Sequence, residues 1–425
     1  MAATTMPAAT AQITYEDLYA RWERGNWSAT EIDFSQDRID WHERMSPEQR
    51  DAALWLFTLF FHGEDSVTDN LSPYIDAAPL EEQKYFLATQ QVDEARHSVF
   101  FKRFIDEVVG RGGDGSIGGA LRATDELLSW GHRKTFHHLD EVAAGLRKDR
   151  SPRNFASAIT MYHLVVEGVL AQPTQHKIDE ALEALDVLPG FREGMRNVSL
   201  DEQRHIAFGV RVLADLHVAD PDGTCEAIVE KVREVLPWTT AVALPPGRDF
   251  AYTAVIGIDL VDLFEEGAML MGQRLRAIGL PVDKLDRFPL PLDLPPREQG
   301  ERGLKLLEAG MLGPKDGPPS RDPEAMAILM DTMRRGAVPG AAPAGTTIQW
   351  EFADADPWFL RLDNGSTAVQ QGRAPSPDVT LRMTFDDFVD VAAGREDARR
   401  MMLRRRIRPS GKLRALARLP KVLPG

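Results

Sequence analysis

The sequence has a single cysteine, Cys225, among 425 residues. One thiol excludes an internal disulfide framework and a cysteine-rich zinc site, and such scarcity is typical of proteins from a reducing compartment. The first residues lack a basic start followed by an apolar run, so we expect no secretory signal. No run approaches the roughly 20 uninterrupted apolar residues of a membrane span. We therefore expect a cytoplasmic protein that does not cross a membrane.

Positive charge is also scarce, because the chain has a formal net charge of -15 at pH 7. Such a balance argues against general nucleic-acid binding. The basic residues gather in the range 395–425, where eleven Lys or Arg face two Asp or Glu. This segment could make peripheral contact with anionic lipid or an acidic partner, but a solvated or internally paired basic face is the simpler interpretation.

Strand signals are nearly absent between residues 46 and 290, where apolar residues recur at helical spacing. The first pattern opens with Ser46 followed by Glu48 and Gln49, as a capped helix does. The sequence therefore predicts an all-α bundle. The expected helices are 46–71, 80–109, 120–146, 152–182, 190–218, 224–235 and 249–278.

The composition changes after about residue 279, where proline and glycine become frequent. Such composition breaks helices and commonly marks a linker. Apolar and polar residues then alternate, "DNG" at 363–365 indicates a hairpin turn, and "FDDFVDVAAG" predicts a helix that ends at Gly394. We expect a bundle domain over 1–290, a linker over 291–322 and a small α+β domain over 323–425.

One pentapeptide pattern occurs twice, as "DEARH" at 93–97 and "DEQRH" at 201–205. Residues three apart share a helix face, so the Glu and His of each copy can reach one ion. Each copy follows a glutamate in an apolar helix, and a bare carboxylate there is costly to bury unless it meets a cation. The six expected metal ligands are Glu64, Glu94, His97, Glu167, Glu202 and His205.

Four glutamates and two histidines from four helices predict the dinuclear carboxylate site of ferritin-like bundles. These hard or borderline ligands suit iron or manganese better than zinc or copper. The simpler alternative is a solvated, charged helix face. Of the ten histidines, however, only His97 and His205 have a glutamate three residues earlier, and both belong to this pattern.

Asp93 and Asp201 directly precede two of the expected ligands. Carboxylates beside such sites often accept the second imidazole N–H, so Asp201 could orient His97 and Asp93 could orient His205. A helix-surface aspartate is the alternative. His62 lies two residues before Glu64 and points away from it on a helix, so we interpret it as a packing or surface histidine.

These residues resemble the ribonucleotide reductase small-subunit superfamily, and "NWSATEIDFSQDRIDW" at 26–41 extends the resemblance over roughly residues 14–280. Reductase subunits mostly have aspartate where this chain has Glu64. They also hold a radical tyrosine where this chain has Phe101, and no tyrosine follows Tyr252. The resemblance therefore does not imply deoxynucleotide synthesis.

The closer resemblance is to the ligand-binding oxidases of this superfamily. Those proteins have a valine and a tyrosine where this chain has Val67 and Tyr162. The resemblance implies a manganese/iron or di-iron centre that uses O2, a tyrosine–valine ether crosslink, a long-chain fatty acid at the metals and a homodimer. Helix geometry alone does not indicate the crosslink, because Tyr162 is about 140° round an ideal helix from Glu167. From spacing alone it is a core tyrosine.

The C-terminal part resembles a sterol carrier protein type two domain through "WEF", "PDVTLRMTFDDFVDVAAG" and "GKLRALARLPKVLPG". This resemblance implies an apolar tunnel for lipids or acyl-CoA. An unrelated α+β accessory or dimerisation domain is the alternative.

Together these features predict an O2-dependent oxidase that removes two electrons from a hydrophobic, fatty-acid-like ligand. A carboxylate-bridged N-oxygenase is one alternative, although such sites usually have a further histidine. A non-catalytic, metal-containing lipid carrier is the second alternative, and a reductase subunit is the third.

Overall fold

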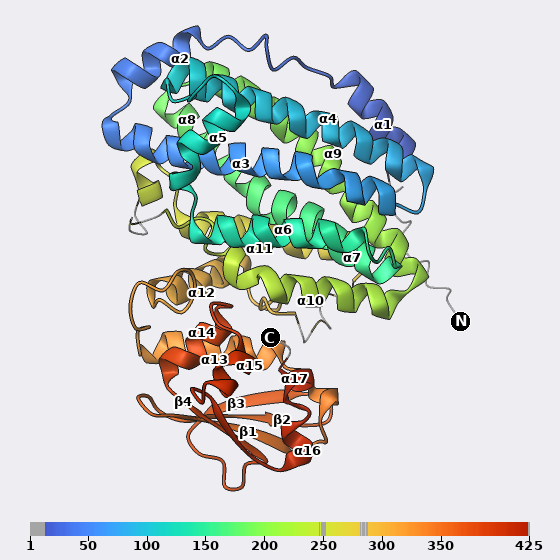
Figure 1. Cartoon of the computed structure of the whole chain (residues 1–425), viewed down its shortest axis with the longest axis vertical. Coiled ribbons are helices and arrows are strands. Elements are labelled where there is room, and N and C mark those ends of the chain that lie inside the picture. The colour runs from blue at the N-terminus through green and yellow to red at the C-terminus, as the bar shows by residue number, and fades with distance from the viewer. Residues whose placement is uncertain are drawn as a thin grey trace, which may run out of the picture.

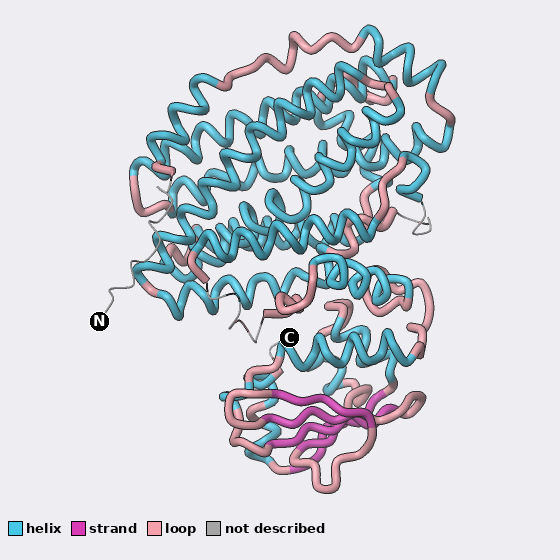
Figure 2. The backbone as a smooth tube through the Cα atoms, turned by 180° about the vertical axis from the view of Figure 1, so that it is seen from behind, coloured by secondary structure: helices cyan, strands magenta, loops and turns pink. Residues whose placement is uncertain are grey.

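The computed structural model describes residues 13–245, 247, 252–280, 282, 285 and 288–423. A large helical body contains the elements from α1 to α11, and a smaller domain below it contains the sheet (Figure 1). All strands of the described residues lie in that smaller domain (Figure 2). The predicted fold class, a helix bundle followed by a small domain with a sheet, is confirmed. No helix within these ranges is long and apolar enough to cross a membrane.

Four long helical segments form the bundle. Ser46 caps the first, because its side chain accepts from the N–H of Gln49 and the Gln49 side chain accepts from the N–H of Ser46. Reciprocal capping of this kind satisfies two backbone donors at a helix start. The segments are α3 (Pro47–Ala77), α4 (Glu81–Phe104), the continuous run α7 (Pro152–Ile159), η4 (Thr160–Ala171) and α8 (Gln172–Leu185), and α9 (Pro189–Ala219).

The middle of the third segment, η4, is a π-helix of 12 residues. Its backbone bonds join residues five apart, so such residues lie on the same side of the helix. Tyr162 and Glu167 are five apart and both line one cavity. The ideal-helix angle expected between them is therefore wrong, because this stretch is not an α-helix.

Shorter helices surround the bundle. The expected helix 120–146 is divided, because α5 ends at Thr124 and Ser129 caps a new helix by accepting from the N–H of His132. The expected helix 249–278 begins only at Leu260, and residues 249–251 lie outside the described part. These helices are α1 (Tyr15–Arg24), α2 (Ser35–Ile39), η1 (Asp40–Arg44), η2 (Ile105–Val109), α5 (Ile117–Thr124), η3 (Asp125–Leu127), α6 (Trp130–Leu146), α10 (Pro221–Thr239), η5 (Tyr252–Ile256) and α11 (Leu260–Ile278).

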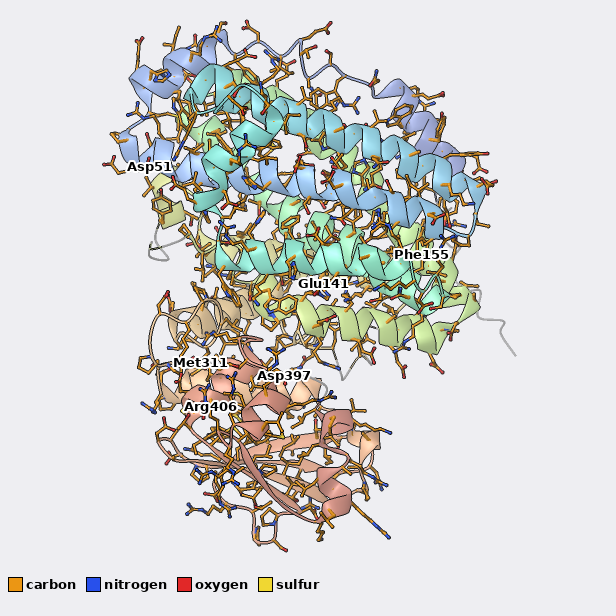
Figure 3. The ribbon with its side chains drawn as sticks, in the orientation of Figure 1. Asp51, Glu141, Phe155, Met311, Asp397 and Arg406 are labelled. Atoms are coloured by element: carbon orange, nitrogen blue, oxygen red, sulfur yellow. The ribbon has the colours of Figure 1, made fainter. Side chains whose placement is uncertain are left out.

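A helix, α12 (Pro296–Glu308), lies within the proline-rich range 291–322. It packs closely on α11, since a Cβ added at Gly300 would lie 2.9 Å from the carbonyl oxygen of Val261. Leu306 near its end joins the apolar core of the small domain, together with Ala309 and the fully buried Met311, which follow the helix (Figure 3). This helix therefore contacts both parts of the chain.

The small domain has a five-stranded sheet in the order β3-β2-β1-β4-β5. Strands β1 and β4 are parallel and the other pairs are antiparallel. The predicted "DNG" turn joins β2 to β3, with Gly365 at φ 78°. The elements are α13 (Pro323–Gly336), η7 (Pro339–Ala341), β1 (Thr346–Phe352), β2 (Trp358–Leu362), β3 (Thr367–Gln371), β4 (Val379–Met383), α14 (Phe385–Ala392), α15 (Ala398–Leu403), β5 (Arg408–Gly411), α16 (Leu413–Leu416) and α17 (Leu419–Val422).

Part of the basic C-terminal range is paired within the domain. Arg406 contacts Asp387, and Lys412 Nζ lies 2.5 Å from an Asp378 oxygen. These pairs agree with the simpler interpretation of that basic face. Peripheral contact with lipid stays a prediction.

Candidate metal centre

Six buried side chains from four segments meet at the centre of the bundle. They form two groups, within each of which one ligand atom per residue lies within 4.8 Å of the others. Glu94 and Glu202 belong to both groups, as ligands shared by two neighbouring ions would. The first group is Glu64, Glu94, His97 and Glu202, and the second is Glu94, Glu167, Glu202 and His205.

The two imidazoles present the same nitrogen to the carboxylates. His97 Nδ1 lies 3.2 Å from Glu64 Oε2, and His205 Nδ1 lies 3.2 Å from Glu94 Oε1. Buried polar atoms normally have a partner. Yet His205 Nδ1 and one oxygen each of Glu94, Glu167 and Glu202 have no partner in hydrogen-bonding geometry, although carboxylate oxygens lie close to the nitrogen. Atoms of this kind fit a pair of divalent cations, so the cluster is able to hold a dinuclear metal centre.

The pKa values show that the buried negative charge of the carboxylates exceeds the positive charge beside them. Burial raises the pKa of Glu64 and Glu167 well above the usual range. Burial alone would lower the pKa of His205, but the charge of Glu94 and hydrogen bonds raise it well above the usual range. Burial also opposes ionisation of Glu94, yet attraction to His205 lowers its pKa well below the usual range. Four buried carboxylates beside two imidazoles therefore favour bound cations.

The aspartate of each pentapeptide contacts the histidine of the other. Asp201 Oδ2 lies 3.1 Å from His97 Nε2, and Asp93 Oδ2 lies 3.1 Å from His205 Nε2. A carboxylate in this position holds the proton on Nε2 and leaves the Nδ1 lone pair for a metal. An indole also donates to each aspartate: Trp27 Nε1 to Asp201 at 2.8 Å and Trp22 Nε1 to Asp93 at 2.9 Å.

Sequence reasoning missed two arginines in this layer. Arg96 contacts Asp93 and lies 3.2 Å from Asp201, while Arg204 contacts Asp201 and lies 3.2 Å from Asp93. Both occupy the same place in the repeated pentapeptide. The repeated arginine was the feature of the sequence that could have identified them.

Gln90 was missed as well. Its Nε2 donates to Glu167 Oε1 at 2.8 Å and to the Tyr162 hydroxyl at 3.0 Å. The Tyr162 hydroxyl in turn donates to Glu94 Oε1 at 2.8 Å. Gln90 lies four residues before Glu94 and so shares its helix face. His62 is outside both ligand groups, with Nε2 3.0 Å from Thr124 Oγ1.

A mostly apolar cavity of about 200 Å³ reaches the carboxylates. Glu64, Glu94, Glu167 and Glu202 line one part of it, and Val67 and Tyr162 line it too. The remaining wall comes mainly from apolar residues of α3, η4, α11 and neighbouring segments. A hydrophobic molecule in this cavity would lie directly against the metal-binding groups.

His132, on the cavity wall, should make stability depend on pH. Its Nε2 lies 3.0 Å from the carbonyl oxygen of Leu59, and burial lowers its pKa to about 3. The unfolded chain binds this proton near pH 6.5, so the contribution is complete above that pH and is lost as pH falls toward 3. Urea unfolding of the metal-free protein gives the slope of unfolding free energy against pH. In His132→Gln this slope should be smaller than in wild type by up to about 1.4 kcal/mol per pH unit.

The matched control is His137→Gln on the same helix, because the His137 side chain is exposed. It should keep the wild-type slope. Equal slopes for wild type and His132→Gln between pH 4 and about 6 would contradict the assignment.

Residues 10–243 match the family "Ribonucleotide reductase, small chain", and residues 340–424 match the "SCP-2 sterol transfer family". An R2-like ligand-binding oxidase from Sulfolobus acidocaldarius is 27% identical with a TM-score of 0.52, and the match covers 63% of this chain and 92% of that chain. A tyrosine-to-phenylalanine variant of an R2-like ligand-binding oxidase, with an anaerobically reconstituted Mn/Fe cofactor, is 26% identical. Its TM-score is 0.54, with 63% and 94% of the two chains covered.

Proposed function

We propose, from the premise that this chain belongs to the ribonucleotide reductase small-chain family, that it is an oxidase rather than a reductase subunit. A manganese/iron or di-iron centre would use O2 to remove two electrons from a hydrophobic, fatty-acid-like ligand. The observation that carries this proposal is the apolar cavity that reaches the carboxylates. The C-terminal domain of the sterol carrier type supports it, since both parts then handle a lipid.

Each side chain has a role that its contacts support. Glu64 with His97 would hold one ion, Glu167 with His205 the other, and Glu94 and Glu202 would be shared. The bound metals would supply the binding and reduction of O2. The chain supplies ligand orientation and a wall that excludes water. Asp93 and Asp201 would fix the imidazole tautomers.

The alternatives fit the site less well. Phe101 has no hydroxyl group, so it offers no phenol for a stored radical. Its ring is fully buried and stacks on Phe60, with ring centroids 5.9 Å apart. Within the described part of the chain, neither ligand group includes a further histidine of the kind expected for an N-oxygenase. An experiment distinguishes a non-catalytic carrier from an oxidase. Oxygen uptake after ferrous iron is added to metal-free protein supports an oxidase, and absence of oxygen uptake supports a carrier.

We expect Tyr162 and Val67 to become linked when metal-free protein is supplied with Mn(II) and Fe(II) in air. Forming the tyrosine O–C bond removes the phenolic hydrogen and one valine C–H hydrogen, and O2 accepts both electrons. Mass spectrometry of the digest should therefore find joined peptides that lack two hydrogen atoms. Both residues line the cavity, and Tyr162 already hydrogen-bonds to Glu94.

The variant Tyr162→Phe should give only separate peptides. The control Tyr74→Phe removes a neighbouring buried phenol, whose ring centroid is 5.6 Å from that of Tyr162, and should still give the link. Separate peptides from fully loaded, oxygen-exposed wild type would refute the crosslink. Failure to bind iron or manganese would refute the oxidase. Cytoplasmic location and a homodimer stay predictions.

A further inference from the structure

A proline interrupts the backbone hydrogen bonds where the π-helix η4 joins α8. The N–H of Gln172 donates to the carbonyl oxygen of Glu167, five residues earlier. The same pattern would pair the N–H of the next residue with the carbonyl oxygen of Gly168. That next residue is Pro173, which has no N–H. The carbonyl directly after the metal-binding Glu167 therefore lacks the donor that the π-helix would give it.

Arg274 of α11 takes the place of that donor. Its guanidinium donates to the carbonyl oxygen of Gly168 and to the side-chain oxygen of Gln172. Arg274 is only 7% exposed, so both bonds form away from bulk water. A buried carbonyl without a donor destabilises the fold. Arg274 thus compensates for the donor that Pro173 cannot provide.

Two glycines let α11 approach η4 closely enough for this contact. A Cβ added at Gly168 would lie 2.9 Å from Nη1 of Arg274, where the guanidinium now packs. A Cβ added at Gly267 of α11 would lie 3.5 Å from the carbonyl oxygen of Val169. Gly267 and Arg274 are seven residues apart and share one face of α11. This face of α11 therefore fits the end of η4.

The π-helix at this place decides which side chains reach the metals. Tyr162 and Glu167 line one cavity, although residues five apart in an α-helix point about 140° away from each other. Long π-helices are rare, so this one needs support from outside its own backbone. Arg274 lies beyond residues 10–243, which match the reductase small chain. The support therefore comes from a part of the chain that the match does not cover.

We propose that Arg274 is a positioning residue for the second metal ion, the one that Glu167 and His205 would hold. It replaces the missing N–H of Pro173 and keeps the end of η4 in π-helix geometry. Glu167 then stays turned toward His205. This inference goes beyond the proposed function, because it concerns how the centre is held and not which oxidation the centre performs.

A role for the charge of Arg274 alone would have the opposite effect. Burial lowers the pKa of Arg274 to about 10 and the charge of Glu167 opposes this shift, so a cation lies near that carboxylate. Removing a cation from beside a metal site should strengthen metal binding, since like charges repel. Loss of positioning should weaken it. The sign of the change in metal affinity therefore distinguishes the two roles.

The test titrates the metal-free full chain with Mn(II), without oxygen, and follows the binding of two ions by calorimetry. In Arg274→Met one ion should bind at least about tenfold more weakly while the other changes little. Combining Arg274→Met with Glu167→Gln should add almost nothing, because both changes affect the same ion. Combining it with Glu64→Gln should give additive losses, because those changes affect different ions.

Pro173→Ala provides a rescue, because it returns a backbone N–H next to the Gly168 carbonyl without adding a charge. The double variant Arg274→Met with Pro173→Ala should bind the second ion almost as wild type does. Hydrogen exchange of the metal-free protein should show the amides at the end of η4 exchanging faster in Arg274→Met and slowly again in the double variant. The matched control is Arg276→Met, since Arg276 is on the same helix but exposed, and it should change neither measurement.

The outcomes separate this inference from the proposed function. Unchanged or tighter Mn(II) binding by Arg274→Met refutes the positioning role, and so does equal weakening of both ions. Failure of Pro173→Ala to restore the second ion refutes the replacement of its N–H. If Arg274→Met does not fold, the double variant should fold and bind two ions, and its failure to do so refutes the inference. Wild type that binds two Mn(II) ions but takes up no O2 with Fe(II) refutes the oxidase and leaves this inference standing.

Discussion

Glu202→Gln is expected to weaken binding of both metal ions strongly and at the same time to make the metal-free protein more stable. Glu202 belongs to both ligand groups, so its loss affects two ions rather than one. Affinity should fall by more than about 100-fold, beyond the effect of losing an outer partner. Without metal, burial and the charge of Glu94 raise the pKa of Glu202, so a neutral amide relieves repulsion. The metal-free variant should gain about 1–3 kcal/mol of unfolding free energy.

Metal analysis after loading and urea unfolding in chelator measure the two effects. Glu82→Gln on α4 is the control, because Glu82 is exposed, and it should change neither quantity. Glu64→Gln and Glu167→Gln should each weaken mainly one ion, since each residue belongs to one group. Retention of both ions by Glu202→Gln, or a less stable metal-free variant, would overturn the shared role.

Asp201→Ala is expected to be the most destabilising substitution in the layer around the site. Asp201 contacts His97, Trp27, Arg96 and Arg204. Burial opposes its ionisation, but the hydrogen bond to His97 and nearby positive charge lower its pKa, so it is ionised at neutral pH. Removing it leaves cationic groups buried with fewer partners. Unfolding free energy should fall by about 3–5 kcal/mol and metal affinity by about 10–100-fold.

A double-mutant cycle with Arg204→Met tests the cause. The two substitutions should be clearly non-additive, because they remove one shared interaction. Asp37→Ala is the matched control: Asp37 is equally buried but accepts from the backbone N–H groups of Gly190 and Phe191, away from the metals. It should lower stability without the loss of metal affinity. Additive effects, or equal metal affinity in Asp201→Ala and Asp37→Ala, would refute the orienting role.

The ligand pattern was readable in the sequence because it depends on local geometry. Glu94 and His97 are three apart on one helix, so their common direction follows from the helix repeat alone. The repeated pentapeptide and the glutamate in an apolar helix before each copy added independent evidence. The turn at Gly365 and the cap at Ser46 were predictable for the same reason, since each depends on a few adjacent residues.

The structure alone decided what lies between helices. Trp22 and Trp27 have no distinctive spacing, and their partners are 71 and 174 positions away, so only packing brings them to the site. Gln90 shares a helix face with Glu94, but its contact with Glu167, 77 positions away, also depends on packing.

The sequence by itself thus determined the metal-binding residue types and the bundle, because helical periodicity fixes which side chains share a face. Tertiary structure decided the rest. The π-helix put Tyr162 and Glu167 on one side, which a 3.6-residue repeat excludes. The packing of α12 on α11 placed Gln299 on the cavity wall, although its proline-rich surroundings indicate a linker. Contacts between distant segments depend on how whole helices pack, and no local pattern contains that information.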